Sequence, residues 1–324
     1  MSKSDPIESA IHAVAQLRGA SPEQAAKALK AYLGHRSNLV VAKAAKLAAE
    51  LRASNLTPEL VAAFHRFMKD PAKLDKRCAA VTEVVSALYE LDYLEPDVYL
   101  WGLHHVQMEA SFGPPVDAAA ALRGISAQGL MRTRHPHAME EVVTLLVDAQ
   151  PPARVGAVRA LAANGGEAGV LLLRLKVLTG EADPDVLAEC FAGLLAAAPD
   201  RSLELVARFM DEGDEATAEA AIWALGQSRL PDALEVLKDK WEGTADRSTR
   251  KALMAALAAS RLPEALDFLY AQVREANVQT ASDVIAALAP YAGVKAIVQG
   301  VRSAVEGRGQ PKLMEAFNSE FRSS

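Results

Sequence analysis

Apolar residues recur along the chain in pairs three positions apart, and the pairs themselves recur at a regular interval. In the C-terminal half the second member of each pair is a leucine, at positions 161, 194, 225, 257 and 288, so the intervals are 33, 31, 32 and 31 residues. The first members of the pairs are Val158, Phe191, Ile222, Met254 and Ile285. Because residues three apart share one face of an α-helix, each pair predicts a helix with a buried stripe.

A second helix follows each of these first helices, and a repeated turn shows where it starts. The stretch SRLPDALEVL (228–237) returns as SRLPEALDFL (260–269). A residue that precedes proline is pushed out of the helical region, whereas proline itself fits the first turn of a helix. Pro231 and Pro263 are therefore expected to begin new helices. Along the whole chain, second helices are predicted to start near residues 58, 96, 136, 166, 199, 231, 263 and 291.

The pattern continues toward the N-terminus with less regular spacing. Three further pairs, at intervals of 41, 34 and 39 residues, are Ala44 and Leu47, Val85 and Leu88, and Ala119 and Leu122. About eight helical hairpins result. A period of 31 to 41 residues with two helices per unit is typical of an α-solenoid, in which each unit buries its apolar face by stacking on its neighbours.

At this point the chain resembles the HEAT repeats, specifically the short bacterial HEAT-like type. The resemblance rests on DEATAEAAIWALGQSRLPDALEVL and DRSTRKALMAALAASRLPEALDFL, in which an acidic start, an alanine-rich first helix and a proline-led second helix recur. It implies an all-α fold, a right-handed α-α superhelix whose second helices line the concave side. The arginine often found in the first helix of that family is represented by Arg159 and, less clearly, by Arg250. Tetratricopeptide repeats have a similar period, but no unit carries their tryptophan, Leu-Gly and tyrosine spacings.

The two ends of the chain are predicted to cap this array. Residues 1–36 contain two shorter helices that are broken at Gly19, and residues 307–324 contain a last helix and a tail after the sequence EGRGQ. The repeats resemble HEAT repeats over residues 37–306. No linker of the usual composition interrupts them, so a single continuous domain is expected.

Composition and charge narrow the class of partner. Apolar residues make up 51% of the chain but aromatic residues only 5%, so the interior is built largely of alanine, leucine and valine. Residues 181–277 hold ten basic and nineteen acidic side chains, so the acidic excess of the chain belongs to this segment. One interpretation is an acidic groove that attracts a basic partner and disfavours phosphate backbones. The other is an ordinary solvated surface of the helices.

Cysteine content and hydropathy indicate the compartment. Cys78 and Cys190 are too far apart in sequence and too few for a metal site or a secreted disulfide scaffold. The N-terminus lacks the apolar core of a secretory signal, and no later stretch of roughly 18 residues is apolar and uncharged. A cytoplasmic protein without a membrane segment is the expectation.

Candidate binding residues gather in the N-terminal repeats, where all seven histidines lie at or before position 137. In the sequence LWGLHHVQME, His105 and Glu109 are four positions apart, a helical spacing that allows two ligands to face one metal ion. His104 lies beside this pair, and Trp101 is expected to serve as a surface anchor, whereas Trp223 is expected to fill the core. The alternative is that one of the two adjacent histidines points inward and the other into water.

Another candidate is the acid-free stretch RGISAQGLMRTRHPH (123–137). It contains Arg123, Arg132, Arg134, His135 and His137 next to a predicted helix start, an arrangement that suits an anion site. The alternative is that these side chains only keep a loop soluble. Just before it, the irregular stretch EASFGPPV (109–116) is expected to fold over the groove.

Short motifs for known reactions are missing. No glycine-rich phosphate loop, GxSxG or HExxH occurs. The repeated His-Glu dipeptides of the HEAT-like deoxyhypusine hydroxylases are also absent, and a net charge of −6 suits the phosphate contacts of a HEAT-like DNA glycosylase poorly. HEAT-like chromophore lyases leave no short motif to check, so that class stays open.

These observations favour a non-enzymatic scaffold that binds a protein or peptide on the concave surface of the solenoid. The expected partner is a protein or peptide with basic character, and neither a cofactor, a metal, a nucleic acid nor a membrane is expected. The alternative is an enzyme or ligand-binding protein, glycosylase-like or lyase-like, with its site in the N-terminal repeats. Convergence of His65, His105 and His137 in one pocket would favour that alternative.

Overall fold

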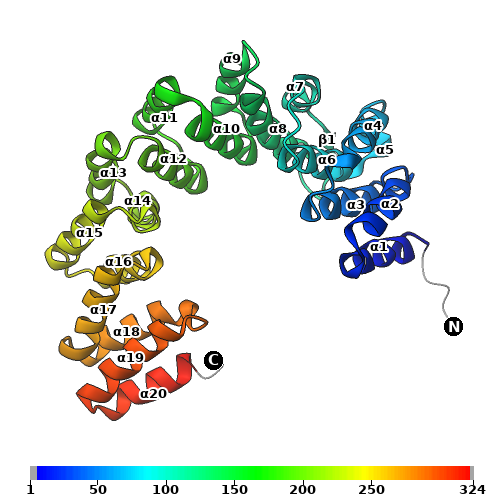
Figure 1. Ribbon diagram of the computed structural model, residues 1–324. Coiled ribbons are helices and arrows are strands. Elements are labelled where there is room, and N and C mark those ends of the chain that lie inside the picture. Colours follow the sequence, from blue (N-terminus) through cyan, green and yellow to red (C-terminus); the bar gives the residue numbers. More distant parts are fainter. Residues whose placement is uncertain (1–5, 322–324) are drawn as a thin grey trace. The chain divides into compact units, whose positions relative to one another are not determined.

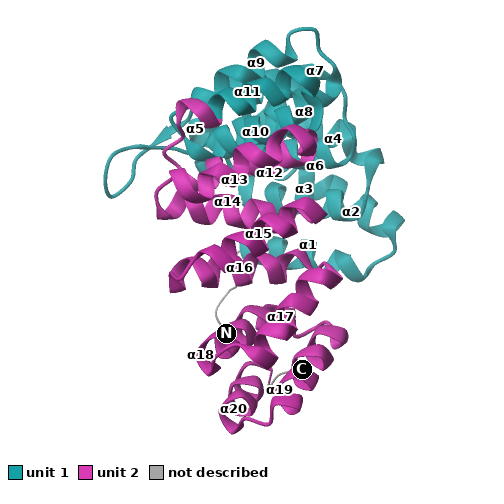
Figure 2. Ribbon diagram, turned by 90° about the vertical axis from the view of Figure 1, so that its left-hand side faces the viewer, with its two compact units in different colours: residues 1–176 teal, residues 177–324 magenta. Residues whose placement is uncertain are grey.

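The computed structural model describes residues 6–321 and is built of helices, most of which pack on helices close to them in the sequence (Figure 1). Twenty α-helices and two very short strands occur in this range. The fold is the all-α arrangement of an α-solenoid. The chain separates into two compact units, residues 1–176 and residues 177–324 (Figure 2).

The first unit contains helices α1 to α10 and a β-hairpin. Its elements are α1 (Pro6–Gln16), η1 (Leu17–Gly19), α2 (Pro22–Leu33), α3 (Asn38–Glu50), η2 (Ser54–Leu56), α4 (Thr57–Phe67), α5 (Pro71–Leu74), η3 (Lys76–Cys78), α6 (Ala79–Glu90), α7 (Pro96–His104), β1 (Met108–Glu109), β2 (Val116–Asp117), α8 (Ala120–Thr133), α9 (Ala138–Thr144), η4 (Leu145–Val147) and α10 (Pro151–Asn164). The helix α11 (Gly166–Thr179) runs across the boundary.

The second unit is the more regular of the two. Its elements are α12 (Pro184–Ala197), α13 (Pro199–Glu212), α14 (Glu215–Ser228), α15 (Pro231–Gly243), α16 (Arg247–Ser260), α17 (Pro263–Glu275), α18 (Val278–Leu288), η5 (Ala289–Tyr291), α19 (Lys295–Arg308) and α20 (Pro311–Glu320). The predicted second helices begin within a few residues of their expected positions. The largest differences are at α9 and α19, where the turn before the helix is longer than expected.

The apolar pairs that define the repeat form the core. All five leucines at positions 161, 194, 225, 257 and 288, and all five apolar residues three positions before them, are buried. The same holds for the leucines at 47, 88 and 122. The prediction of one buried stripe per first helix is confirmed.

The acidic start of the first helices has a local cause. Asp183, Asp214 and Asp246 precede α12, α14 and α16, and the side chain of each accepts a hydrogen bond from a backbone N–H of the first turn. Such caps satisfy N–H groups that have no partner within the helix and so stabilise the helix end. Part of the negative charge of this segment therefore serves the helix ends.

The repeated sequence SRLP forms the same turn twice. The hydroxyls of Ser228 and Ser260 donate to the carbonyls of residues 225 and 257, and each accepts from the backbone N–H two residues later. Arg229 and Arg261 end their helices in the left-handed conformation, with φ of 54° and 53°. Each turn thus closes the first helix before the proline opens the second.

Within residues 177–324 the first helices α12, α14, α16 and α18 pack on one another in succession. Among the second helices α13 and α15 meet only marginally, whereas α17 packs on α19. Figure 1 shows α12, α14 and α16 on the inner side of this unit and α13, α15 and α17 on its outer side. The expectation that second helices line the concave side is therefore wrong for this unit. The physical reason is side-chain size: small residues on the first helices let their axes approach closely, as at Gly226 against the backbone of Ala256.

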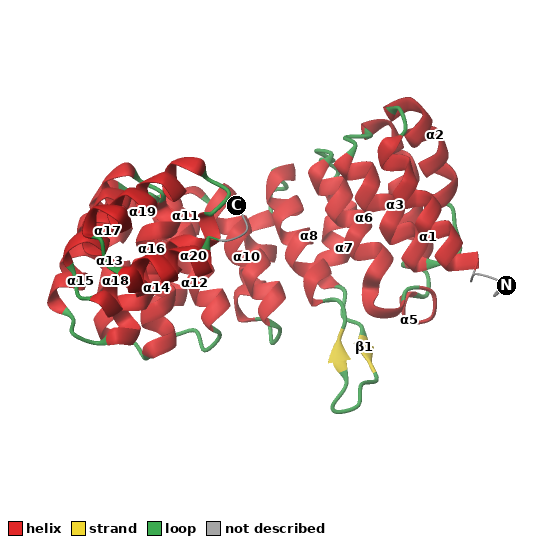
Figure 3. Cartoon of the chain, turned by 90° about the horizontal axis from the view of Figure 1, so that it is seen from below, coloured by secondary structure: helices red, strands yellow, loops and turns green. Residues whose placement is uncertain are grey.

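The stretch 109–116 does not fold over a groove. It forms the outer part of a hairpin in which Met108 pairs with Asp117 and Glu109 with Val116. Figure 3 shows this hairpin standing out from the helices of its unit. Its outer apolar residues Val106, Met108, Phe112 and Val116 are exposed.

Candidate functional site

Three of the predicted binding residues meet at the C-terminal end of helix α7. Trp101, His104 and His105 line, with Leu100, an open hollow of about 500 Å³. Trp101 is 54% exposed, so its predicted place at the surface is confirmed, and the ring of His65 from α4 meets it edge-on with centroids 6.0 Å apart. His104 Nε2 lies 3.0 Å from Glu141 Oε2. These contacts form a surface patch on a second helix, outside the row of first helices.

The proposed pairing of His105 with Glu109 on one helix face is wrong. Helix α7 ends at His104, and His105 has an extended backbone with ψ of 131°. Glu109 lies in β1, where its Oε1 accepts from the backbone N–H of Arg77 at 2.5 Å and from Gln107 Nε2 at 2.6 Å. Because the helix ends before His105, His105 and Glu109 are not one helical turn apart and cannot face one metal ion in that way.

The arginine-rich stretch does not form an open anion site. Arg123 is 4% exposed and Arg132 forms an ion pair with Asp92, while its guanidinium lies 4.7 Å from the ring centre of Tyr89. Arg134 caps α8 in the left-handed conformation, with φ of 57°. Two of the three arginines that were expected to meet an anion are thus already held by carboxylates.

The histidines do not converge. His137 Nδ1 lies 2.5 Å from Glu140 Oε2, and its ring is 6.0 Å from that of His135. The hollow beside Trp101 includes His105 but neither His65 nor His137. Within residues 6–321 no three His, Cys, Asp or Glu side chains are grouped so that they could hold a metal ion.

A buried polar network holds the base of the hairpin. Arg123 Nη1 lies 2.7 Å from Asp117 Oδ2, its Nε lies 2.8 Å from Asp148 Oδ2, and it also donates to the carbonyl of His105. Burial raises the pKa of Asp117, but N–H donors of Ala119 and Gln107 together with Arg123 outweigh it and leave that pKa below its ordinary value. Because every member bonds another, the network has a structural role.

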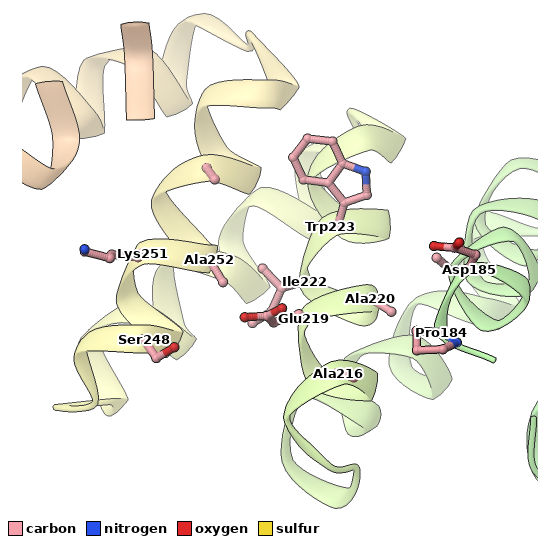
Figure 4. A pocket seen from close by; sticks show the side chains of 12 residues that line it. Pro184, Asp185, Ala216, Glu219, Ala220, Ile222, Trp223, Ser248, Lys251 and Ala252 are labelled. Atoms are coloured by element: carbon pink, nitrogen blue, oxygen red, sulfur yellow. The ribbon is translucent and has the colours of Figure 1, made fainter. Parts of the chain in front are cut away.

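The other candidate site lies on first helices of the second unit. We call it the Trp223 groove: an open depression of about 590 Å³ between α12, α14 and α16. Its lining consists of Pro184, Asp185, Ala188, Ala216, Glu219, Ala220, Ile222, Trp223, Ser248, Lys251, Ala252 and Ala255. Figure 4 shows Trp223 and Glu219 on the central helix, between residues of α12 on one side and of α16 on the other.

Trp223 stands at the wall of this groove and is 45% exposed. The expectation that it fills the core is wrong. It follows Ile222, which is buried, and lies on the exposed stripe of α14 together with residues 216, 219 and 227. Alanines on the three helices leave open space beside the indole instead of covering it.

The charges around the groove are uneven. Asp185 and Glu219 have no ion-pair partner in the part of the chain that the structure describes. Lys251 is the basic residue of the lining, and its Nζ lies 3.8 Å from Asp283 Oδ1, which also pairs with Arg247. Two carboxylates at the groove are therefore free to meet a cation from outside.

Comparison with known proteins gives one clear result. The family of HEAT repeats matches residues 171–258 and again residues 205–289. This part of the chain is a HEAT-repeat array. A search of the curated proteins finds no match.

Two solved structures are similar to this chain at low identity. One is the complex of CpcE and CpcF of phycocyanin lyase from Nostoc sp. PCC7120, with 14% identity, a TM-score of 0.36, and coverage of 74% of this chain and 92% of that chain. The other is an engineered protein, with 15% identity, a TM-score of 0.38, and coverage of 100% and 97%. Since both TM-scores lie below 0.5, neither structure bears on the function of this chain.

The Trp223 groove lies inside the matched HEAT repeats, and the sequence contained a signal for it. Residues 216, 219 and 223 follow the spacing of one helix face, turned away from the stripe of Ile222 and Leu225. The family resemblance predicted that the second helices line the inner face, so this stripe of a first helix was not predicted as a site. No helix of residues 6–321 has the length and apolarity needed to cross a membrane.

Proposed function

We propose that the protein is a non-enzymatic scaffold that binds a protein or peptide in the Trp223 groove. HEAT repeats commonly mediate protein binding. The observation that carries the proposal is a half-exposed tryptophan beside a floor of alanines on three successive helices. Tryptophan is the side chain most enriched among residues that dominate binding energy at protein interfaces.

The rigidity of the groove supports the proposal. The first helices are held by aspartate caps and by close backbone packing such as that of Gly226 on Ala256. A surface that is already ordered loses little conformational entropy when it binds. An extended partner segment or a helix could lie along the row of first helices, with one side chain against the indole.

Site-specific photo-crosslinking tests the proposal. A photoreactive amino acid is placed at Ala188, on one wall of the groove, and in a second variant at Glu242, an exposed residue on the outer helix α15. Both variants are irradiated in a nuclease-treated lysate of the source cells. The expected result is a discrete protein crosslink from position 188 that is absent from position 242.

The crosslink must also depend on the groove itself. Adding Trp223→Ala to the position-188 variant is expected to remove it, whereas adding Trp101→Ala leaves it in place. A crosslink that survives Trp223→Ala, or crosslinks confined to nucleic acid in a lysate without nuclease, would contradict the proposal.

A further inference from the structure

We infer that the occupant of the Trp223 groove is a basic segment, in which an apolar side chain is followed closely by lysine or arginine. This inference rests on the proposed function, because it names the chemistry of the partner for the same groove. A second, smaller depression lies next to the Trp223 groove and shares part of its lining. That depression fixes which charge the partner must carry.

The second depression, here called the acidic hollow, has a volume of about 340 Å³. It is lined by Glu215, Ala218, Glu219, Ile222, Asp246, Ser248 and Thr249. Three of these residues, Glu219, Ile222 and Ser248, also line the Trp223 groove. An apolar side chain seated against Trp223 therefore places its neighbours at the acidic hollow.

The acidic hollow holds three carboxylates, those of Glu215, Glu219 and Asp246, and its lining contains no basic side chain. Asp246 accepts from the backbone N–H of Thr249 at 2.7 Å and from its hydroxyl at 2.8 Å, and these bonds hold its pKa below the ordinary value. Glu215 accepts a hydrogen bond from Ser248 at 3.3 Å. The acidic hollow has no lysine or arginine in its lining, and Lys251, the basic residue that lines the Trp223 groove, lies 3.8 Å from Asp283.

Charge complementarity selects the partner. Asp185 and Glu219 border the groove without an ion-pair partner in the described part of the chain, and residues 181–277 carry an excess of nine negative charges. Like charges placed opposite one another disfavour a partner, whereas opposite charges speed its approach and fix its register. An acidic peptide or a phosphate backbone would meet repulsion at the same place where a lysine or arginine forms an ion pair.

The test is selection of random peptides displayed on phage against the full chain, followed by fluorescence anisotropy with the selected peptides. Peptides with an apolar residue beside lysine or arginine are expected. Their affinity is expected to fall at least tenfold with Trp223→Ala, and roughly two- to fivefold with Glu219→Gln or Asp185→Asn. It also falls as salt rises, because solvent-exposed ion pairs are screened.

A matched control separates local from general electrostatics. Glu242→Gln on the outer helix α15 removes the same charge away from the groove and is expected to leave the affinity unchanged. Selected peptides that need Trp223 but lack basic residues, or that ignore Glu219→Gln and Asp185→Asn, would overturn the inference and leave the proposed function standing. Failure to enrich any peptide, or binding indifferent to Trp223→Ala, would overturn both.

Discussion

Two tryptophans in neighbouring helices of residues 177–324 have opposite environments. Trp241 is 5% exposed, meets Phe268 edge-on with ring centres 6.1 Å apart, and lies under the guanidinium of Arg250. Trp223 is 45% exposed at the edge of the groove. Trp241 therefore contributes to the core, whereas part of the Trp223 ring is accessible to a partner.

This contrast gives a matched pair of variants. Trp241→Ala is expected to lower the free energy of unfolding by about 3–5 kcal/mol, because it leaves a cavity in the core. Trp223→Ala is expected to lower it by about 1 kcal/mol or less, because the indole has few partners to lose. Urea denaturation of both variants measures the difference. Equal losses would show that Trp223 is a structural residue.

Asp117 makes stability depend on pH. Its pKa is lowered in the folded protein, so its contribution is fully present above the ordinary carboxyl value of about 3.9 and is lost as the pH falls through the lower folded value. The free energy of unfolding is therefore expected to decline below a pH of about 4, and less steeply in Asp117→Asn. The measurement is urea denaturation across acidic pH. An unchanged slope in the variant would assign the decline to other carboxylates.

The thiols of the chain give a probe of native packing. Both cysteines are buried, and burial, followed by the nearby charge of Asp75, raises the pKa of Cys78 to about 12. Since only the thiolate is nucleophilic, Cys78 is expected to resist a thiol reagent at mildly alkaline pH until the protein unfolds. Titration with and without denaturant, using Cys190→Ala to isolate Cys78, measures this. Fast reaction of the native variant would contradict the buried placement.

At the scale of single residues, the sequence predicted which side chains are buried better than it predicted which polar side chains contact one another. The leucines of the repeat were located because one apolar stripe recurs, but Arg123 was expected in an exposed anion site and instead lies buried between Asp117 and Asp148. Its partners are six and twenty-five positions away, and no periodic pattern connects them. Contacts of that kind depend on how the hairpin folds back.

At the scale of helices, the turns explain why the starts of the second helices were predicted accurately. Proline opens α13, α15 and α17 at the expected positions, and in α15 and α17 it follows a residue with an extended backbone. The hairpin was missed because its strands have only two residues each, too few for an alternating pattern. It is held by the buried side chains of Gln107 and Asp117, which the sequence alone does not bring together.

Close packing between first helices can be tested at a glycine. A Cβ at Gly226 of α14 would clash with the backbone of Ala256 on α16, whereas one at Gly307 of α19 meets nothing within 4 Å. Gly226→Ala is expected to lower the free energy of unfolding by about 1–3 kcal/mol. Gly307→Ala is expected to leave it unchanged or raise it by about 0.4–1 kcal/mol. Thermal denaturation of the pair measures this, and equal effects would contradict the close approach of α14 and α16.

At the scale of the whole molecule, the repeat pattern predicted the architecture but not the surface that is open. The family resemblance assigned the inner side to the second helices, while the alanine-rich first helices occupy it in residues 177–324. Whether the first or the second helices lie on the inner side depends on the side-chain volumes at all the interfaces between repeats. The sequence of one repeat does not contain this information. As a result the candidate site moved from the histidines near Trp101 to the groove beside Trp223.

The most direct test of the account is the affinity of the crosslinked partner for three forms of the full chain, measured by isothermal titration calorimetry. The forms are the unmodified protein, Trp223→Ala and Trp101→Ala, with unchanged thermal stability as the control for folding. Trp223→Ala is expected to weaken the affinity for the partner at least tenfold. Trp101→Ala is expected to have the same affinity as the unmodified protein. Loss of binding in Trp101→Ala with full binding in Trp223→Ala would contradict it and return the site to the histidine-rich repeats.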